Sequence, residues 1–329
     1  MQKILLTAFI VLIFLSCKDN CRHEVKDISP ITVDINRLED KLFSFKSKED
    51  ARAFLQEHKV YTQQFLQTPD INDDKFLTQF YQFYTNPNLK DFYKETKNKF
   101  GDLDQLKVEL GNLFSYIKHY YPKSFIPQVS STVTGFQFDK DLLVSDSAII
   151  ISIDYFLGKQ AKYRPPFFKY FLERYEKEYI TPLIGLAMSN KFNVVNTKDE
   201  TMLANMVYYG KAYYFVERTM PCLPDSMIAM YTTKQMKAIT ENENIIWGHF
   251  IEKKLLFETK PQTIEKYLGE SPKISEIGEE CPGRIGRWIG WNIVRKYMEG
   301  HPEVTLQGLM KEQDAQKIFR LSKYKPKSK

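Results

Sequence analysis

The stretch TKDETMLANMVYYGKAYY, residues 197–214, carries the clearest helical pattern in this chain of 329 residues. Thr197 and Glu200 have the spacing of a capping box, in which two side chains satisfy free backbone N–H groups at a helix start. Apolar residues then recur three and four positions apart, which places them on one face of an α-helix. The residues of that face are Leu203, Met206, Val207, Gly210, Tyr213 and Tyr214. The pattern predicts a helix that begins near Thr197 and packs one face into a hydrophobic core.

The regions around this helix predict an α+β fold. Ser147–Asp154 contains a run of isoleucines of strand length and predicts a buried strand, while Ile31–Ile35 and Val129–Phe138 have weaker strand patterns. Helical spacing dominates residues 37–121 and returns, with interruptions, over residues 165–300. No internal repeat, low-complexity block or strong linker divides the chain. We therefore expect a single, predominantly helical domain with a small central sheet.

The N-terminus predicts export and a lipid anchor. Lys3 precedes the apolar run Ile4–Leu15, which is shorter than the about 20 residues needed to cross a bilayer and has the length of a signal-peptide core. The run ends in a small residue followed by Cys17, which resembles a lipobox, although Phe14 departs from the aliphatic residue usual there. An ordinary secretory signal followed by a chance cysteine is the alternative. We predict that residues 1–16 are removed, that Cys17 carries acyl chains such as palmitate, and that the protein lies in the cell envelope.

The rest of the chain divides into a tether, a domain and a tail. Polar residues 17–30 predict a tether that lifts the domain off the membrane, residues 31–320 the soluble domain, and lysine-rich residues 321–329 a basic tail. The tail would be a solvated terminus or would contact anionic head groups. The formal net charge of +6 is spread along the chain without a dense basic stripe, so we expect no nucleic-acid partner.

Three further cysteines leave the disulfide pattern open. Cys21, Cys222 and Cys281 form an odd set once Cys17 is assigned to lipid, and an exported protein can form disulfides. Cys222 with Cys281 is one pairing, but spacing alone does not establish it.

The sequence lacks the common catalytic motifs. It has five histidines, and no two of them are four residues apart, as the HExxH zinc motif requires. His249 and Glu252 share a helical face, but one such pair is a weak metal site. There is no Gly-x-Ser-x-Gly nucleophile motif and no phosphate-binding glycine loop. We therefore expect no catalytic residue, no metal and no cofactor.

Two helical segments are candidate binding regions. Three glycines from Gly283 to Gly290 would form a smooth helix face, and each glycine inside a helix costs about 1 kcal/mol relative to Ala, which indicates close contact. That face would be packed within the chain, or would dock a partner helix or a ligand with help from Trp and Arg, which are enriched at binding hot spots. The candidate interaction residues are Gly283, Arg284, Gly286, Arg287, Trp288, Gly290 and Trp291. In the helix predicted to begin near Thr197, four consecutive residues would be either core residues or the wall of a pocket: Tyr208, Tyr209, Gly210 and Lys211.

Several segments, in order along the chain, resemble one known family. They are Ile151–Gly158, Met206–Lys211, Glu243–Trp247, Cys281–Arg295 and Ser322–Pro326. Together they resemble the gliding-motility lipoprotein family GldB of the Bacteroidetes, and the glycine and tryptophan segment that follows Cys281 is the most specific. The resemblance implies a membrane-anchored, non-enzymatic lipoprotein required for gliding and for the linked type IX secretion apparatus. We expect the domain to face the periplasm rather than the cell surface. Its implied partners are the membrane and other proteins of that apparatus, with no known small-molecule substrate.

The same family is distantly similar to predicted HExxH peptidases, which implies a zincin-like fold. In those proteins a second helix carries a Glu ligand just before a Gly, and the matching residue here is Tyr209. The first-helix histidines would fall within Arg174–Ile180, which contains none. The resemblance therefore implies a peptidase-like scaffold that has lost its metal ligands. Two alternatives stay open: an active metallopeptidase or hydrolase with unconventional ligands, and a glycan- or lipid-binding envelope lipoprotein.

Replacing Cys17 tests the predicted anchor. Cys17→Ala removes the thiol that would carry the acyl chains, each of which contributes about 0.8 kcal/mol per buried CH₂ to membrane binding. We expect the variant to move from the membrane fraction to the soluble fraction when cells are fractionated. A variant that stays on the membrane without lipid would contradict the anchor.

Overall fold

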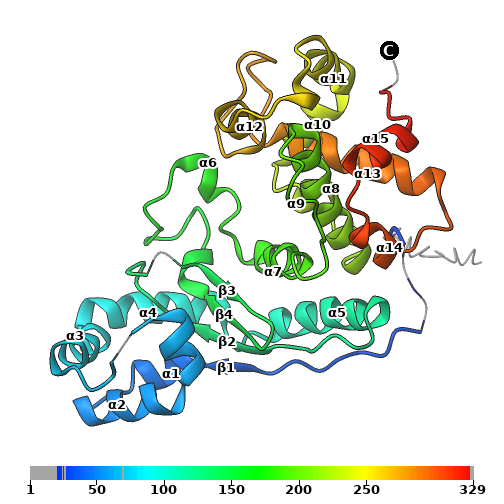
Figure 1. Cartoon of the computed structure of the whole chain (residues 1–329). Helices are drawn as coiled ribbons and strands as arrows, with labels where there is room; N and C mark the ends of the chain where they lie inside the picture. Colours follow the sequence, from blue (N-terminus) through cyan, green and yellow to red (C-terminus); the bar gives the residue numbers. More distant parts are fainter. Residues whose placement is uncertain (1–20, 24, 26, 69, 139, 327–329) are drawn as a thin grey trace, which may run out of the picture.

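The structure, a computed structural model, describes residues 21–326 except 24, 26, 69 and 139. Its centre is a mixed sheet with the strand order β1-β2-β4-β3 (Figure 1). The strands are β1 (Ile35–Arg37), β2 (Gln128–Thr132), β3 (Leu142–Val144) and β4 (Ala148–Ser152). β1, β2 and β4 are parallel, and β3 pairs antiparallel with β4 at the sheet edge.

The strand predictions are confirmed in part. The isoleucine run forms β4, in which all five residues are buried. The strand predicted at Ile31–Ile35 is displaced, because β1 begins at Ile35. The preceding residues lie along the helix α5 (Asp104–Tyr120), where the Ile31 N–H donates to the Ser115 hydroxyl at 2.9 Å. Contact with a helix replaces strand pairing there.

The helices before β2 lie beside the sheet, and those from α1 to α3 enclose an aromatic cluster. They are α1 (Leu38–Leu42), α2 (Lys48–Glu57), a π-helical turn (Tyr61–Phe65), α3 (Asp74–Thr85), α4 (Pro87–Phe100) and α5. Buried rings from this region pack against one another: Phe45, Phe54, Tyr61, Phe65, Phe80 and Tyr84. The helical pattern predicted for residues 37–121 is therefore confirmed.

The helices after β4 form a second layer, in which α8 and α13 cross (Figure 1). They are α6 (Lys169–Leu172), α7 (Ile180–Ser189), α8 (Met202–Thr219), α9 (Asp225–Ile228), α10 (Thr233–Glu241), α11 (Glu243–Glu252), α12 (Pro261–Leu268), α13 (Ile285–Gly300), α14 (Leu306–Lys311) and α15 (Ala315–Ser322). Short 3₁₀ turns occur at Ile153–Phe156, Lys177–Tyr179 and Leu255–Phe257. One continuous hydrophobic core joins the sheet to α5, α8 and α13, so the predicted single α+β domain is confirmed.

Helix α8 begins later than its sequence pattern predicts. The capping box predicted at Thr197 does not form, and Thr201 is the N-cap, its hydroxyl accepting from the Ala204 N–H at 3.2 Å. The Asp199 carboxylate accepts from both the N–H and the hydroxyl of Thr201, which holds that cap in place. A second Thr four residues along thus replaces the predicted one. The predicted apolar face is confirmed, because all six of its residues are buried.

Helices α8 and α13 cross with their backbones in contact. Gly210 of α8 faces the backbone of Gly290 in α13, and Gly290 faces the carbonyl group of Met206. A Cβ atom at either glycine would overlap these backbone atoms, so only glycine permits this approach. Beside the crossing, the rings of Tyr213 and Trp291 pack edge to face with centroids 5.7 Å apart. Packing within the chain explains why glycine occurs at both positions.

A buried carboxyl group follows β4 directly. Asp154 is fully buried, and its Oδ2 atom accepts from the N–H and the hydroxyl of Thr134 at 3.1 and 2.9 Å. These bonds fix a turn in which Gly135 and Phe136 both have positive φ angles. Burial nevertheless raises the pKa of Asp154 to about 6. The Asp154 carboxyl group therefore fixes the turn, and its ionisation lowers the stability of the folded state because the charge is buried.

Substitution of Gly290 tests the helix crossing. Gly290→Ala places a methyl group against the backbone of α8, and we expect it to lower the free energy of unfolding by about 3 kcal/mol, as overpacking does. The control is Gly248→Ala in α11, where a Cβ atom would meet nothing within 4 Å. That change should be neutral or stabilising by up to about 1 kcal/mol. Equal effects of the two substitutions in chemical denaturation would contradict the crossing.

The pH dependence of stability tests the burial of Asp154. Since folding raises its pKa from 3.8 to about 6, the folded state binds more protons between these values. The contribution of this group to stability therefore falls as the pH rises through that interval, by about 3 kcal/mol in total. Asp154→Asn cannot ionise, so the stability of the natural protein relative to this variant should fall by most of that amount between pH 4 and pH 7. Asp146→Asn, which changes an exposed carboxyl group, is the control. If the stability difference between the natural protein and Asp154→Asn did not depend on pH, the raised pKa of Asp154 would be refuted.

Candidate binding site

The seven residues predicted as an interaction face lie largely inside the domain. Each glycine faces another part of the chain: Gly283 faces Ser271, Gly286 faces Leu268 and Gly290 faces Met206. Arg284, Trp288 and Trp291 are 7%, 4% and 0% exposed, and Arg287 is the one member of the set that is partly exposed. The docking interpretation of this face is therefore wrong, because α8 and the segment after α12 already occupy it.

The four residues predicted as core or pocket wall divide between two faces of α8. Tyr208 and Lys211 line a cavity of about 660 Å³. On the other side, the guanidinium group of Arg287 lies over the Tyr209 ring, 4.1 Å from its centroid, and Gly210 contacts α13. Tyr208 and Lys211 therefore border a space that a ligand could enter, whereas Tyr209 and Gly210 hold α13 against α8.

The cavity lies between α8, the loop before it, the start of α12 and the segment after α14. Its apolar lining comes from Val194, Val195, Ala204, Val207, Pro261, Ile264 and Ala315. Carboxyl groups from Asp199, Glu200, Glu265 and Glu312 also line it. Apolar walls with acidic groups suit a ligand that has an apolar part and a positive charge.

The ammonium group of Lys211 binds backbone carbonyl oxygens instead of pointing its charge into this cavity. Its Nζ atom donates to the carbonyl oxygens of Val194 and Glu312, both at 2.8 Å, and to that of Met310 at 3.4 Å. These bonds use all three protons of the ammonium group. Burial lowers the pKa of Lys211 to about 8. The side chain therefore ties α8 to the two loops that form the cavity wall.

One segment that the peptidase resemblance assigns to metal ligands, Arg174–Ile180, reaches Glu270 through Arg174. The Glu270 carboxylate lies 2.7 Å from Nη1 of Arg174 and 3.2 Å from Nε of Arg284. Burial acts to raise the pKa of Glu270, but the charges of Arg284 and Arg174 outweigh it and hold that pKa below its usual value. Arg287, which lies over Tyr209, adds a third positive charge. This excess of positive charge would repel a divalent cation.

The surroundings of His249 and Cys281 favour a role in packing over a role in chemistry. The Nε2 atom of His249 lies 2.8 Å from the hydroxyl of Tyr267, which donates to Glu276 at 2.7 Å, so Glu252 is not its partner. Burial raises the pKa of the Cys281 thiol to about 12, which leaves it protonated and unreactive at neutral pH. Within the described part of the chain, no three His, Cys, Asp or Glu side chains are grouped so that they could hold a metal ion.

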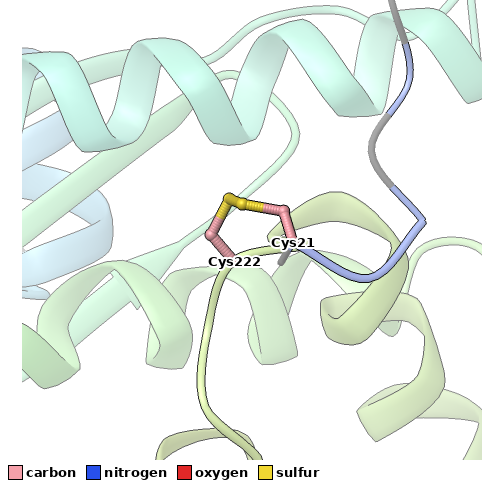
Figure 2. Close-up of a disulfide and its surroundings, with 2 residues drawn as sticks. All are labelled: Cys21 and Cys222. Atoms are coloured by element: carbon pink, nitrogen blue, oxygen red, sulfur yellow. A yellow bond between two sulfur atoms is a disulfide. The ribbon is translucent and has the colours of Figure 1, made fainter. Parts of the chain in front are cut away.

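An N-terminal strap, defined as the described residues between 21 and 34, is bound to the domain at Cys21–His23 and at Ile31. Cys21 forms a disulfide with Cys222, which is 201 residues away in sequence (Figure 2). Closing a loop of this length removes chain entropy from the unfolded state equivalent to about 5 kcal/mol. Arg22 contacts the Asp225 carboxylate at 2.8 Å. The pairing of Cys222 with Cys281, left open by the sequence, is therefore excluded, and Cys281 is free.

Both predicted boundaries of the soluble domain need correction. The tether predicted at residues 17–30 is wrong for Cys21–His23, because the disulfide and ion pairs fix these three residues to the domain. The basic tail predicted from residue 321 is also partly folded: the Tyr324 hydroxyl donates to Glu243 at 2.6 Å and its ring packs on Trp247. The predicted signal peptide, Cys17 and residues 18–20 lie outside the described residues, as do residues 327–329.

A single carboxylate joins the strap to the helix crossing. Glu217 of α8 is 5% exposed and accepts from the Trp291 indole at 2.8 Å and from Nε of Arg295 at 2.7 Å, while Nε2 of His23 lies 3.4 Å away. Burial acts to raise the pKa of Glu217, but the hydrogen bond from His23 and the charge of Arg295 hold it below its usual value. Sequence reasoning missed Glu217. The one sequence feature that could have indicated it is a charged residue directly after the apolar residues Phe215 and Val216.

Comparisons with known proteins identify the family. Residues 18–326 match the family described as gliding motility protein GldB, which covers the strap, the sheet and all the helices above. No curated protein and no solved structure is similar enough to match the chain. Within the described residues, no helix is both long and apolar enough to cross a membrane. The match spans far more than half of the chain, and the protein therefore belongs to the gliding motility protein GldB family.

Proposed function

We propose that this protein is a non-enzymatic, lipid-anchored binding or assembly component of the gliding apparatus and of the linked type IX secretion machinery. Membership of the GldB family supports a part in gliding. The lipobox-like sequence that ends at Cys17 supports a lipid anchor in the envelope, with the domain on the periplasmic side. The partners in this proposal are the membrane and other proteins of the apparatus.

The charges around Glu270 carry the non-enzymatic part of the proposal. A zinc peptidase needs neutral imidazoles and carboxylates that converge on the metal. Here the corresponding segments contribute Arg174 and Tyr209, and the nearby carboxylate is already paired with two guanidinium groups. Binding of a metal ion by Glu270 would therefore require its contacts with Arg174 and Arg284 to break.

A zincin-like origin of the scaffold belongs to the same proposal. A mixed sheet with an antiparallel edge strand, followed by α7 and α8 packed together, is compatible with such a layout. Such an origin is a likeness of fold, which does not determine function. It accounts for a domain that has kept peptidase-like helices while Tyr209 contacts Arg287 instead of a metal.

The cavity beside Tyr208 offers space for the ligand of one alternative, a glycan- or lipid-binding lipoprotein. Its volume of about 660 Å³ lies in the range of small-molecule sites. Ala204→Trp would fill it from α8. If native mass spectrometry finds a sugar or lipid on the natural protein and not on this variant, ligand binding replaces assembly as the proposed function.

Metal content and motility test the main proposal. We expect the purified protein to contain far less than stoichiometric zinc, because guanidinium groups occupy the expected site and Tyr267 engages His249. His249→Ala should restore gliding to cells that lack the protein, and so should His119→Ala, the matched control at an exposed histidine. Stoichiometric zinc that is lost in His249→Ala, together with lost gliding, would establish the metallopeptidase alternative instead.

A further inference from the structure

The chain between the proposed lipid and the domain is very short. Cys17 and Cys21 are four residues apart, and four extended residues span at most about 14 Å. If the chain were held only from Ile31, where contacts with α5 begin, fourteen residues would span about 50 Å. The Cys21–Cys222 disulfide therefore shortens the longest reach of the anchor more than threefold.

Several contacts besides the disulfide hold the start of the strap. Arg22 reaches Asp225 at 2.8 Å and Glu217 at 4.0 Å. The two ring nitrogens of His23 lie near Glu217 and Arg218, the latter at 3.1 Å. The strap is thus bound to α8 and α9 by one covalent bond and by charged groups. These contacts hold the chain against the domain at Cys21–His23.

The segment from Cys17 to Cys21, called the leash below, restricts by its length how far the domain can tilt at a membrane. A globular domain of about 300 residues has a radius of roughly 25 Å. A point on such a sphere that can rise no more than about 14 Å from the membrane allows a tilt of only about 60° to any side. A leash of about 50 Å, equal to the diameter, would allow every orientation.

We propose that the attachment edge, defined as Cys21–His23 with Cys222–Asp225, faces the bilayer surface and fixes the orientation of the domain. The proposal rests on the lipid at Cys17 that belongs to the proposed function. The occupant of this surface is the lipid head-group layer of the membrane that holds the anchor. The length and endpoint of the chain before Cys21 select this occupant, because any protein partner would have to fit within the same short gap.

The surface chemistry of the attachment edge is compatible with head groups. Cys222 and Pro224 are exposed, and the Arg22 side chain is 52% exposed beside its ion pairs. A guanidinium group in this position can also contact lipid phosphates. Figure 1 shows the start of the strap, which contacts α8, at the opposite end of the molecule from α2 and α3. Helices α2 and α3 would therefore point away from the membrane and toward other components.

Photocrosslinking to lipid tests this orientation on the full-length protein. The lipidated protein is reconstituted in vesicles of phosphatidylcholine and phosphatidylglycerol that contain a phospholipid with a photoreactive head group, and adducts are mapped by mass spectrometry. We expect adducts in peptides that contain Arg22 or residues 222–228, and none in α2. Adducts in α2 at the same yield as at the attachment edge would overturn the orientation.

Variants separate the role of the disulfide from that of the lipid. Cys21→Ser combined with Cys222→Ser keeps Cys17, so the protein should still float with vesicles but lose the bias of its adducts. Cys281→Ser, which removes the free buried thiol, should keep that bias. A native adduct pattern in the double variant, with its fold verified by circular dichroism, would overturn the role of the short leash. Failure of the natural protein to float would instead refute the anchor itself, and with it the proposed function.

Discussion

The crossing of α8 and α13 is the contact on which the rest of the structure depends. Gly210 and Gly290 let the two backbones touch, and this brings the Trp291 indole and Arg295 onto the buried carboxylate of Glu217. The same carboxylate receives His23 from the strap, so the start of the strap is joined to the helical layer. A wider helix separation would leave the charge of Glu217 buried without its partners, which is strongly destabilising.

Local patterns predicted the elements of the fold better than the contacts between them. The isoleucine run and the apolar face of α8 were recognisable because burial repeats along a strand or a helix with a fixed period. The start of α8 was misplaced because Thr197 and Thr201 both have capping chemistry, and neighbouring Asp199 selects the second. β3 was missed because three residues at a sheet edge carry too little pattern to detect.

The candidate site was harder to predict because its residues are far apart in sequence. The glycines after Cys281 indicated a close contact, but only the structure shows that the partner is the chain itself. The Cys21–Cys222 pair spans 201 residues, and no local spacing announces it. The positions compared with metal ligands could be located from the resemblance, whereas the pairing of Arg174 and Arg284 with Glu270 required coordinates.

Peptide mapping of the unreduced protein extracted from membranes tests the central claim, a domain held at the membrane by a short covalent leash. Mass spectrometry of the digest reads the chemical state of Cys17, Cys21 and Cys222 together. The account predicts a mature chain that starts at a lipid-modified Cys17, with its Cys21 joined to the peptide that contains Cys222. An unmodified N-terminus, or a free Cys21 thiol, would contradict it.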